Sequence, residues 1–244
     1  MTSITKYRQI KASLEKLEQK LPPYMPDNAV IDEWKKRSSS GSAALNEDDF
    51  PADWAAMALT GLLSDLQKIS LSEEDSLQLI VEYDGQGRLP TELCGLDSAI
   101  LMMYIHLADQ WAWQRLAKTV LTVAPPDVSW DYSHCPCCGD NPVAAYFAPE
   151  DGSRHLVCGT CHTAWRYRRI GCPYCGEHSH DRLRVLEADE YPGWLIMACQ
   201  NCRGTLKTAD MRRMAIMPDW NEAQLELLPL DFAADKWIGK ADNE

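Results

Sequence analysis

Apolar residues recur at helical spacing through the first half of the chain. The first run steps by three and four residues and ends at Pro22-Pro23. It consists of Tyr7, Ile10, Leu14, Leu17 and Leu21. This periodicity predicts an amphipathic helix. Because the pattern lasts only about two heptads, we interpret it as a helix packed on its own domain rather than a coiled coil.

Similar patterns predict further helices over 29–37, 52–69, 77–83 and 96–123. A serine- and acid-rich stretch separates the second from the third and is typical of a loop. Pro125-Pro126 follows the last predicted helix. We therefore expect residues 1–126 to form an all-α domain.

Beyond these prolines the pattern changes to short apolar runs, which are typical of β-strands. They cover 143–147, 155–157, 183–186 and 194–198. A further stretch alternates Trp165, Tyr167 and Arg169 with Arg166, Arg168 and Ile170, so that each set would lie on one side of a strand. Aromatic and arginine side chains of this kind favour packing between modules, a protein partner or stacked bases.

Four Cys-x-x-Cys pairs bracket these runs and form an internal repeat. The first and third pairs share the turn Cys-Pro-x-Cys-Gly, and the second and fourth lack the proline. The candidate metal ligands are Cys135, Cys138, Cys158, Cys161, Cys172, Cys175, Cys199 and Cys202. Eight thiolates at this spacing predict two four-cysteine metal sites.

The intervals between the pairs suit two-stranded ribbons that bring one pair back to another. We therefore assign Cys135, Cys138, Cys158 and Cys161 to one ion, and Cys172, Cys175, Cys199 and Cys202 to the other. An interleaved pairing stays open. Four thiolates bind zinc and also a single iron of the rubredoxin type, so both metals stay open.

Other potential ligands lie near these pairs. His155, His162, His178 and His180 are interpreted as non-ligands, because eight cysteines already complete two shells. Cys137 lies between the two ligands of the first pair, and we expect it to face away from the ion as an exposed thiol. A reactive role and an incidental one both stay open for it.

The charge of the chain narrows the choice of partner. The net charge is −12, and residues 131–213 carry ten basic and ten acidic residues. A nucleic-acid-binding domain normally has a basic surface, so this balance disfavours nucleic acid. The longest apolar run, 100–107, is too short to cross a bilayer, and the charged N-terminus does not resemble a signal peptide. We expect a cytoplasmic protein without membrane insertion, in which paired cysteines hold metal more often than disulfides.

These features predict an α+β chain. The helical domain of 1–126 is followed by a first four-cysteine ribbon at 127–168, a second at 169–213 and an acidic C-terminal tail at 214–244. Homodimer formation stays open.

The sequence resembles the FdhE family of formate dehydrogenase accessory proteins. The resemblance rests on the five residues from Cys135 to Gly139 with Pro142-Val143-Ala144 behind them, and on the six residues from Leu156 to Cys161. It continues through Trp165, Arg168 or Arg169, and Cys172 to the run Cys199-Gln200-Asn201-Cys202 with Leu206-Lys207. The ending, 228–234, is also similar to that of the family.

The resemblance implies a helical domain followed by two tandem rubredoxin-like or zinc-ribbon modules. It further implies a non-catalytic, cytoplasmic maturation factor that holds two metal ions, iron or zinc. The implied partner is the catalytic subunit of a formate dehydrogenase that contains molybdenum or tungsten and is exported by the twin-arginine route, with its signal peptide as one candidate contact. Two alternatives stay open: a rubredoxin-like iron redox protein, and a zinc-ribbon protein that binds nucleic acid.

Overall fold

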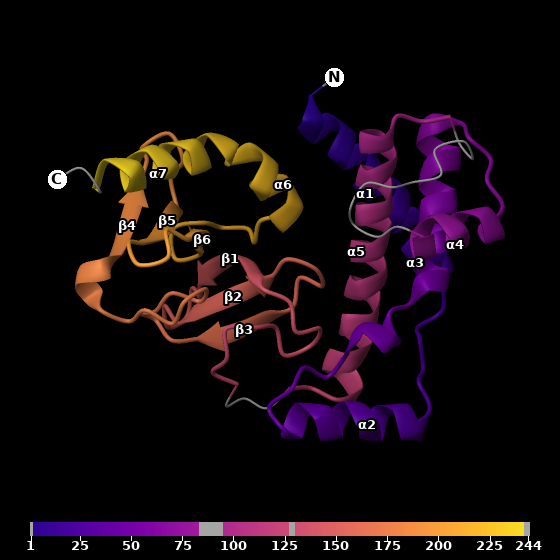
Figure 1. Cartoon of the computed structure of the whole chain (residues 1–244), viewed down its shortest axis with the longest axis horizontal. Helices are drawn as coiled ribbons and strands as arrows, with labels where there is room; N and C mark the ends of the chain where they lie inside the picture. The colour runs from indigo at the N-terminus through magenta and orange to yellow at the C-terminus, as the bar shows by residue number, and fades with distance from the viewer. Residues whose placement is uncertain (1, 83–94, 127–129, 242–244) are drawn as a thin grey trace. The chain divides into compact units, whose positions relative to one another are not determined.

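The computed structural model describes residues 2–82, 95–126 and 130–241 and divides the chain into two units. The first unit comprises Met1–Lys35 and Leu45–Pro125, and the second comprises Lys36–Ala44 and Pro126–Glu244 (Figure 1). Cys94, the one cysteine outside the paired region, lies outside the described residues. Within those residues, no helix is long and apolar enough to cross a membrane.

The first half of the chain is helical, as predicted. Its α-helices are α1 (Ser3–Lys20), α2 (Asn28–Ser39), α3 (Ala52–Leu62), α4 (Glu73–Glu82) and α5 (Ser98–Val123). A 3-10 turn, Glu47–Asp49, precedes α3, and a π-helical turn, Leu63–Gln67, follows it. The predicted helix over 52–69 therefore ends in a widened turn, and Lys68 adopts the left-handed conformation at its end.

Helix α3 lies at the centre of the helical unit. Its buried residues, including Leu59 and Leu62, pack with Ile10 of α1, Leu79 of α4 and Ile105 of α5. Full burial of one such side chain contributes about 1.5–3 kcal/mol relative to leaving it exposed. The apolar spacing that predicted these helices is therefore also the source of their packing energy.

The second unit is built on one six-stranded sheet. The strands are β1 (Pro142–Phe147), β2 (Arg154–Cys158), β3 (Ala164–Tyr167), β4 (Leu183–Glu187), β5 (Trp194–Cys199) and β6 (Thr205–Asp210). Their order is β3-β2-β1-β6-β5-β4. The repeat in the sequence is a repeat in the fold, because each half contributes three antiparallel strands.

A parallel pair, β1 and β6, joins the two halves of the sheet. Its register runs from Ala144 opposite Lys207 to Phe147 opposite Asp210. Packing between the two modules was one expectation for the stretch from Trp165 to Ile170, but β3 forms an outer edge of the sheet instead. The strand that forms the junction, β6, had not been predicted.

Residues 220–241, part of the expected acidic tail, form helices α6 (Trp220–Glu226) and α7 (Leu228–Ala241). Figure 1 shows α7 along the β4–β5 side of the sheet, and Trp220 of α6 packs with Ala144 of β1 and Ala209 of β6. Leu227 and Leu230 pack against Ile196 of β5 in a small core. Lys207 of β6 anchors this cover, with its Nζ atom 2.7 Å from the carboxylate of Asp231.

Candidate metal centres

The first cluster brings together the sulfur atoms of Cys135, Cys138, Cys158 and Cys161. All four atoms lie within 4.8 Å of one another. The Sγ–Sγ distance is 3.6 Å for Cys135 and Cys161, and 3.4 Å for Cys138 and Cys158. Zinc–sulfur bonds of about 2.3 Å in a tetrahedron would place the sulfur atoms about 3.8 Å apart. The cluster therefore has the size of a single tetrahedral ion.

The second cluster repeats this arrangement with Cys172, Cys175, Cys199 and Cys202. The Sγ atoms of Cys172 and Cys202 are 3.5 Å apart, and those of Cys175 and Cys199 are 3.7 Å apart. The sulfur atoms thus gather in the sequential order, and neither cluster mixes cysteines from the two halves. The donor set fits zinc and iron alike.

The turns explain how each pair faces its ion. In the first, the N–H of Gly139 donates to the carbonyl oxygen of Cys135 at 3.0 Å, and the N–H of Gly176 donates in the same way to Cys172 in the third. Both glycines have φ near +80°, a left-handed conformation that glycine adopts without steric cost. The two identical sequence motifs are therefore two identical turns.

The turns without proline reach the same geometry with other residues. His162 and Arg203 directly follow the second cysteine of their pairs and have φ values of 56° and 62°. Backbone N–H groups point at the sulfur atoms, as in the 3.4 Å contacts from Thr160 to Cys158 and from Gly204 to Cys202. Such donors favour the thiolate, which is the form that binds metal.

The packing of four thiols in the first cluster favours the binding of a cation. Burial raises the pKa of Cys135 well above its ordinary value, while hydrogen bonding with Cys135 and then with Cys158 and Cys161 lowers the pKa of Cys138. Four packed thiols therefore share protons unequally, since they cannot all ionise together. A divalent ion that binds four thiolates replaces those protons.

The second cluster is more open to solvent. Cys175 and Cys202 are exposed, whereas Cys172 and Cys199 are buried. Burial opposes ionisation of Cys175, but hydrogen bonds from the backbone N–H of Glu177, the side-chain amide of Asn201 and the neighbouring cysteine thiols together lower its pKa to about 7. The second cluster therefore offers a thiolate at neutral pH and an exposed edge.

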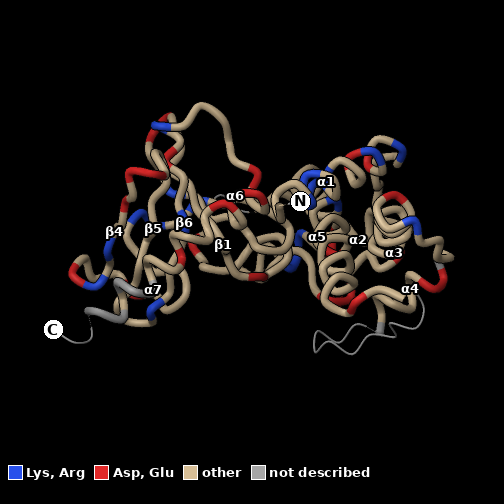
Figure 2. Tube along the Cα trace, turned by 90° about the horizontal axis from the view of Figure 1, so that it is seen from above, with Lys and Arg blue, Asp and Glu red and all other residues tan. Residues whose placement is uncertain are grey.

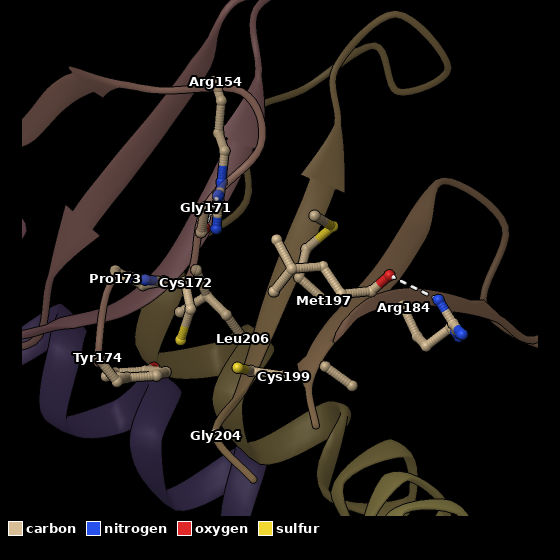
Figure 3. Close-up of a pocket in the computed structure, with 12 residues that line it drawn as sticks. Arg154, Gly171, Cys172, Pro173, Tyr174, Arg184, Met197, Cys199, Gly204 and Leu206 are labelled. Carbon is tan, nitrogen blue, oxygen red and sulfur yellow. Dashed lines mark hydrogen bonds between the residues drawn. The ribbon is translucent and has the colours of Figure 1, made fainter. Parts of the chain in front are cut away.

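Arg154 of β2 reaches from the first half of the sheet to the second cluster. Its Nη1 atom donates to the carbonyl oxygen of Gly171 at 2.7 Å, directly before Cys172 (Figure 3). A small cavity of about 10 Å³, lined by Arg154, Cys172 and Cys199, separates these groups. Because four thiolates and a divalent ion carry a net charge of −2, a buried guanidinium nearby stabilises the site. Sequence reasoning missed this residue, because one arginine in a strand has no signature of its own.

Cys137 differs from the expectation of an exposed thiol. Its side chain is fully buried, and its backbone N–H donates to the sulfur of Cys135 at 3.3 Å. The segment 36–44 covers this turn, since the N–H of Ala44 donates to the carbonyl oxygen of Pro136 at 2.9 Å. The residue is outside the cluster of four, as expected, but it is not accessible.

The alternating stretch around β3 packs as its pattern predicts. Trp165 and Tyr167 are buried and Arg166 is exposed. The Trp165 indole donates to the carbonyl oxygen of Tyr132 at 3.0 Å, which ties β3 to the chain before the first turn. His155 stacks on Tyr146 with ring centroids 4.9 Å apart and belongs to neither sulfur cluster.

Fold and sites together define an α+β protein with a helical N-terminal region and two four-cysteine, zinc-ribbon-like modules. Residues 134–169 match the family model of the FdhE central domain. The chain is 31% identical over 94 residues to a protein FdhE homolog of Aquifex aeolicus, and 33% identical over 106 residues to one of Stutzerimonas stutzeri. These alignments cover 37% and 42% of this chain. Over this region the chain is similar to FdhE proteins.

The extent of these matches differs between sequence and structure. The chain spans about a third, 33%, of the length of the two curated relatives. The crystal structure of the FdhE protein from Pseudomonas aeruginosa aligns with 93% of this chain, and the match covers 82% of that protein. The TM-score is 0.66 at 22% identity. The fold therefore extends beyond the region in which the sequences are visibly alike.

Proposed function

We propose that this chain is a non-catalytic accessory protein that holds two metal ions through its eight paired cysteines. In this role it assists the maturation of a formate dehydrogenase catalytic subunit in the cytoplasm. The proposal combines the geometry of the two clusters with the resemblance to FdhE.

The observation that carries the non-catalytic role is the closure of both clusters. Each offers four cysteine sulfur atoms within 4.8 Å of one another. A tetrahedral ion held by four such ligands has no position left for a substrate or an activated water, whereas catalytic zinc keeps one open. The ions would instead stabilise the turns at the ends of β2 and β5, and with them the shared sheet.

The client is inferred from the FdhE resemblance. Residues 1–130 carry 12 basic and 19 acidic residues, and Figure 2 shows both signs spread along the chain. An excess of acidic charge would attract a basic segment, such as a twin-arginine signal peptide, and would speed its association. Binding of the client before export is the step that we assign to this protein.

A co-purification experiment tests the proposal. The metal-loaded chain, purified without oxygen, should retain a formate dehydrogenase catalytic subunit from anaerobic extract. Cys138→Ala removes one ligand and should abolish retention, whereas Cys137→Ala changes the neighbouring thiol outside the cluster and should preserve it. Failure of the metal-loaded protein to retain the subunit would contradict the proposed function.

The exposure of Cys175 and Cys202 favours one second candidate, electron transfer through an iron at the second cluster. Such a site needs an edge close to solvent, and the buried first cluster has none of comparable exposure. Metal analysis and potentiometry on anaerobically purified protein separate the two roles. A colourless protein with two zinc ions per chain would eliminate electron transfer.

A further inference from the structure

A cavity of about 420 Å³ lies beside the first half of the sheet. It is formed by the turn between β1 and β2, the end of β3 and the chain that precedes the first cysteine turn. None of the eight paired cysteines lines it. Its volume falls within the usual range for small-molecule pockets, about 300–1,000 Å³.

Arginines dominate the charge of this cavity. Arg154, Arg166, Arg168 and Arg169 line it, against the two carboxylates of Asp131 and Asp151. The lining thus carries two more positive than negative charges, in a chain whose net charge is −12. Such local inversion of charge concentrates anions.

The two carboxylates neutralise the arginines only weakly. Asp131 lies 3.5 Å from Arg168, but their side chains are 66% and 44% exposed, and solvent screens such a pair. The carboxylate of Asp151 accepts a hydrogen bond from the backbone N–H of Ser153 at 2.8 Å. The guanidinium of Arg166 forms no hydrogen bond or ion pair within the described part of the chain, and, after the hydrogen bonds from Ser153, its positive charge helps to lower the pKa of Asp151.

Arg154 gives the cavity a buried positive charge. Its side chain is 1% exposed, and its Nη1 atom donates to the carbonyl oxygen of Gly171. Among the described residues no carboxylate pairs with it, and its Nε atom has no hydrogen-bond partner. A desolvated cation is costly unless a negative charge compensates it. Arg154 lines both the small cavity beside the second cluster and this larger one, so an anion bound in the larger cavity would lie near a buried guanidinium.

Two other guanidinium groups are held in place by aromatic rings. Arg168 lies 5.3 Å from the centroid of Tyr167, and Arg169 lies 5.5 Å from that of Phe147. Arg169 also donates to the carbonyl oxygen of Gly152 at 3.0 Å. Groups fixed in this way lose little side-chain freedom on binding a ligand, so their donors are preorganised.

We propose that this cavity binds the phosphate group of a small molecule. Planar guanidinium groups match the oxygen geometry of phosphate with paired hydrogen bonds. The excess of two positive charges suits a phosphate or diphosphate better than a single carboxylate. Convergence of four arginines on one cavity, rather than along a groove, favours a small molecule over an acidic peptide. The assignment does not depend on the client named above.

Calorimetry with inorganic pyrophosphate and inorganic phosphate tests the assignment on the full, metal-loaded chain. We expect one binding site per chain and an affinity that falls with added salt. Arg166→Gln and Arg168→Gln should each weaken binding about tenfold, the loss expected for one hydrogen bond to a charged group. Arg182→Gln alters an exposed arginine outside the cavity and should change nothing. Circular dichroism and metal content check that each variant is folded.

Three outcomes of the calorimetry would overturn the assignment. Neither anion gives binding heat, or Arg182→Gln weakens anion binding as much as the cavity variants do. In the third, the heat persists in every variant because pyrophosphate extracts the metal. A glutamate-rich peptide or a generic oligonucleotide that bound far more tightly, with the same dependence on Arg166 and Arg168, would show that the cavity serves a macromolecule instead.

Discussion

In the first cluster Cys135, Cys158 and Cys161 are buried, whereas Cys175 and Cys202 of the second are exposed. Yet the proline turns of both clusters share the same backbone hydrogen bonds and the same left-handed glycine. The difference therefore arises from what packs around the turns. The two clusters have the same four-cysteine ligand set in the same sheet, but solvent reaches the second more readily than the first.

The cover of the first cluster comes from chain segments that precede its cysteine turns. The N–H of Ala44 donates to Pro136 within the first turn, and the side chain of Ala43 lies close to Gly139. The rings of Trp130 and Tyr132, 4.9 Å apart, lie on the chain that enters the turn. The first ion would thus be part of a packed core, and the second would lie near solvent. This predicts a structural role for the first ion and an exchangeable one for the second.

The largest expected effect is the loss of a buried ligand. Cys158→Ala should lower the free energy of unfolding by more than about 4 kcal/mol, because the ion replaces much of the core of a small module. Cys175→Ala removes an exposed ligand of the other cluster and should cost about half as much. Thermal unfolding followed by circular dichroism, with metal content measured for each variant, provides the comparison.

Cys137→Ala is the matched control for these two variants. It empties the volume of a buried thiol but leaves both clusters complete, so we expect a cost of about 1 kcal/mol and two bound ions. Equal losses in Cys158→Ala and Cys175→Ala would show that exposure does not distinguish the two sites.

A chelator should remove the two metal ions at different rates. A strong chelator should remove the second ion about ten times faster than the first, since access to the sulfur atoms limits ligand exchange, and this ratio corresponds to about 1.4 kcal/mol in the barrier. Native mass spectrometry would then detect a species with one ion. Simultaneous loss of both ions would mean that the shared sheet couples the clusters more strongly than their surroundings separate them.

Spacing and periodicity were sufficient to predict the helical half, the four turns and the grouping of their cysteines. These features are local, or depend on a short ribbon that returns one turn to another. The tetrahedral preference of a four-thiolate ion adds a constraint that few folds satisfy. Sequence reasoning works best where local geometry and ligand chemistry coincide.

The junction between the halves could not be predicted in this way. Strand β6, Thr205–Asp210, lacks the alternation of a half-buried strand and carries Lys207 at a buried position. That lysine is stabilised there by Asp231, 24 positions later, and by Gln224. The burial of Cys137 likewise depends on residues 36–44. Each of these features depends on a contact between distant parts of the chain.

Lys207 offers a test of the helical cover over the second half of the sheet. Its side chain is 7% exposed, and its Nζ atom contacts both Asp231 and Gln224 at 2.7 Å. Lys207→Ala should cost about 2 kcal/mol and should speed release of the second ion, because α6 and α7 lose their anchor on β6. The cost is moderate since Asp231 is 35% exposed and can be solvated. Urea unfolding and chelator kinetics measure the two effects.

Lys207→Met serves as the companion variant. It keeps the volume of the side chain without its charge, so it should cost less than Lys207→Ala, as apolar replacements of buried ion pairs commonly do. Release of the first ion should be unaffected in both. A change at the first cluster would show that the parallel β1–β6 pair transmits the disturbance across the sheet.

The smallest expected effect is a shift in thiol reactivity in the species that retains only the first ion. The pKa of Cys175 is lowered to about 7 from an ordinary value of 9.0. Its thiolate should therefore form as the pH rises through 7, and alkylation by iodoacetamide should reach half its maximal rate there. Peptide mass spectrometry locates the adduct, with buried Cys137 as the unreactive control. A midpoint near 9.0 would show that the hydrogen bonds to Cys175 form only when the ion is bound, so that the third turn takes its geometry from the metal.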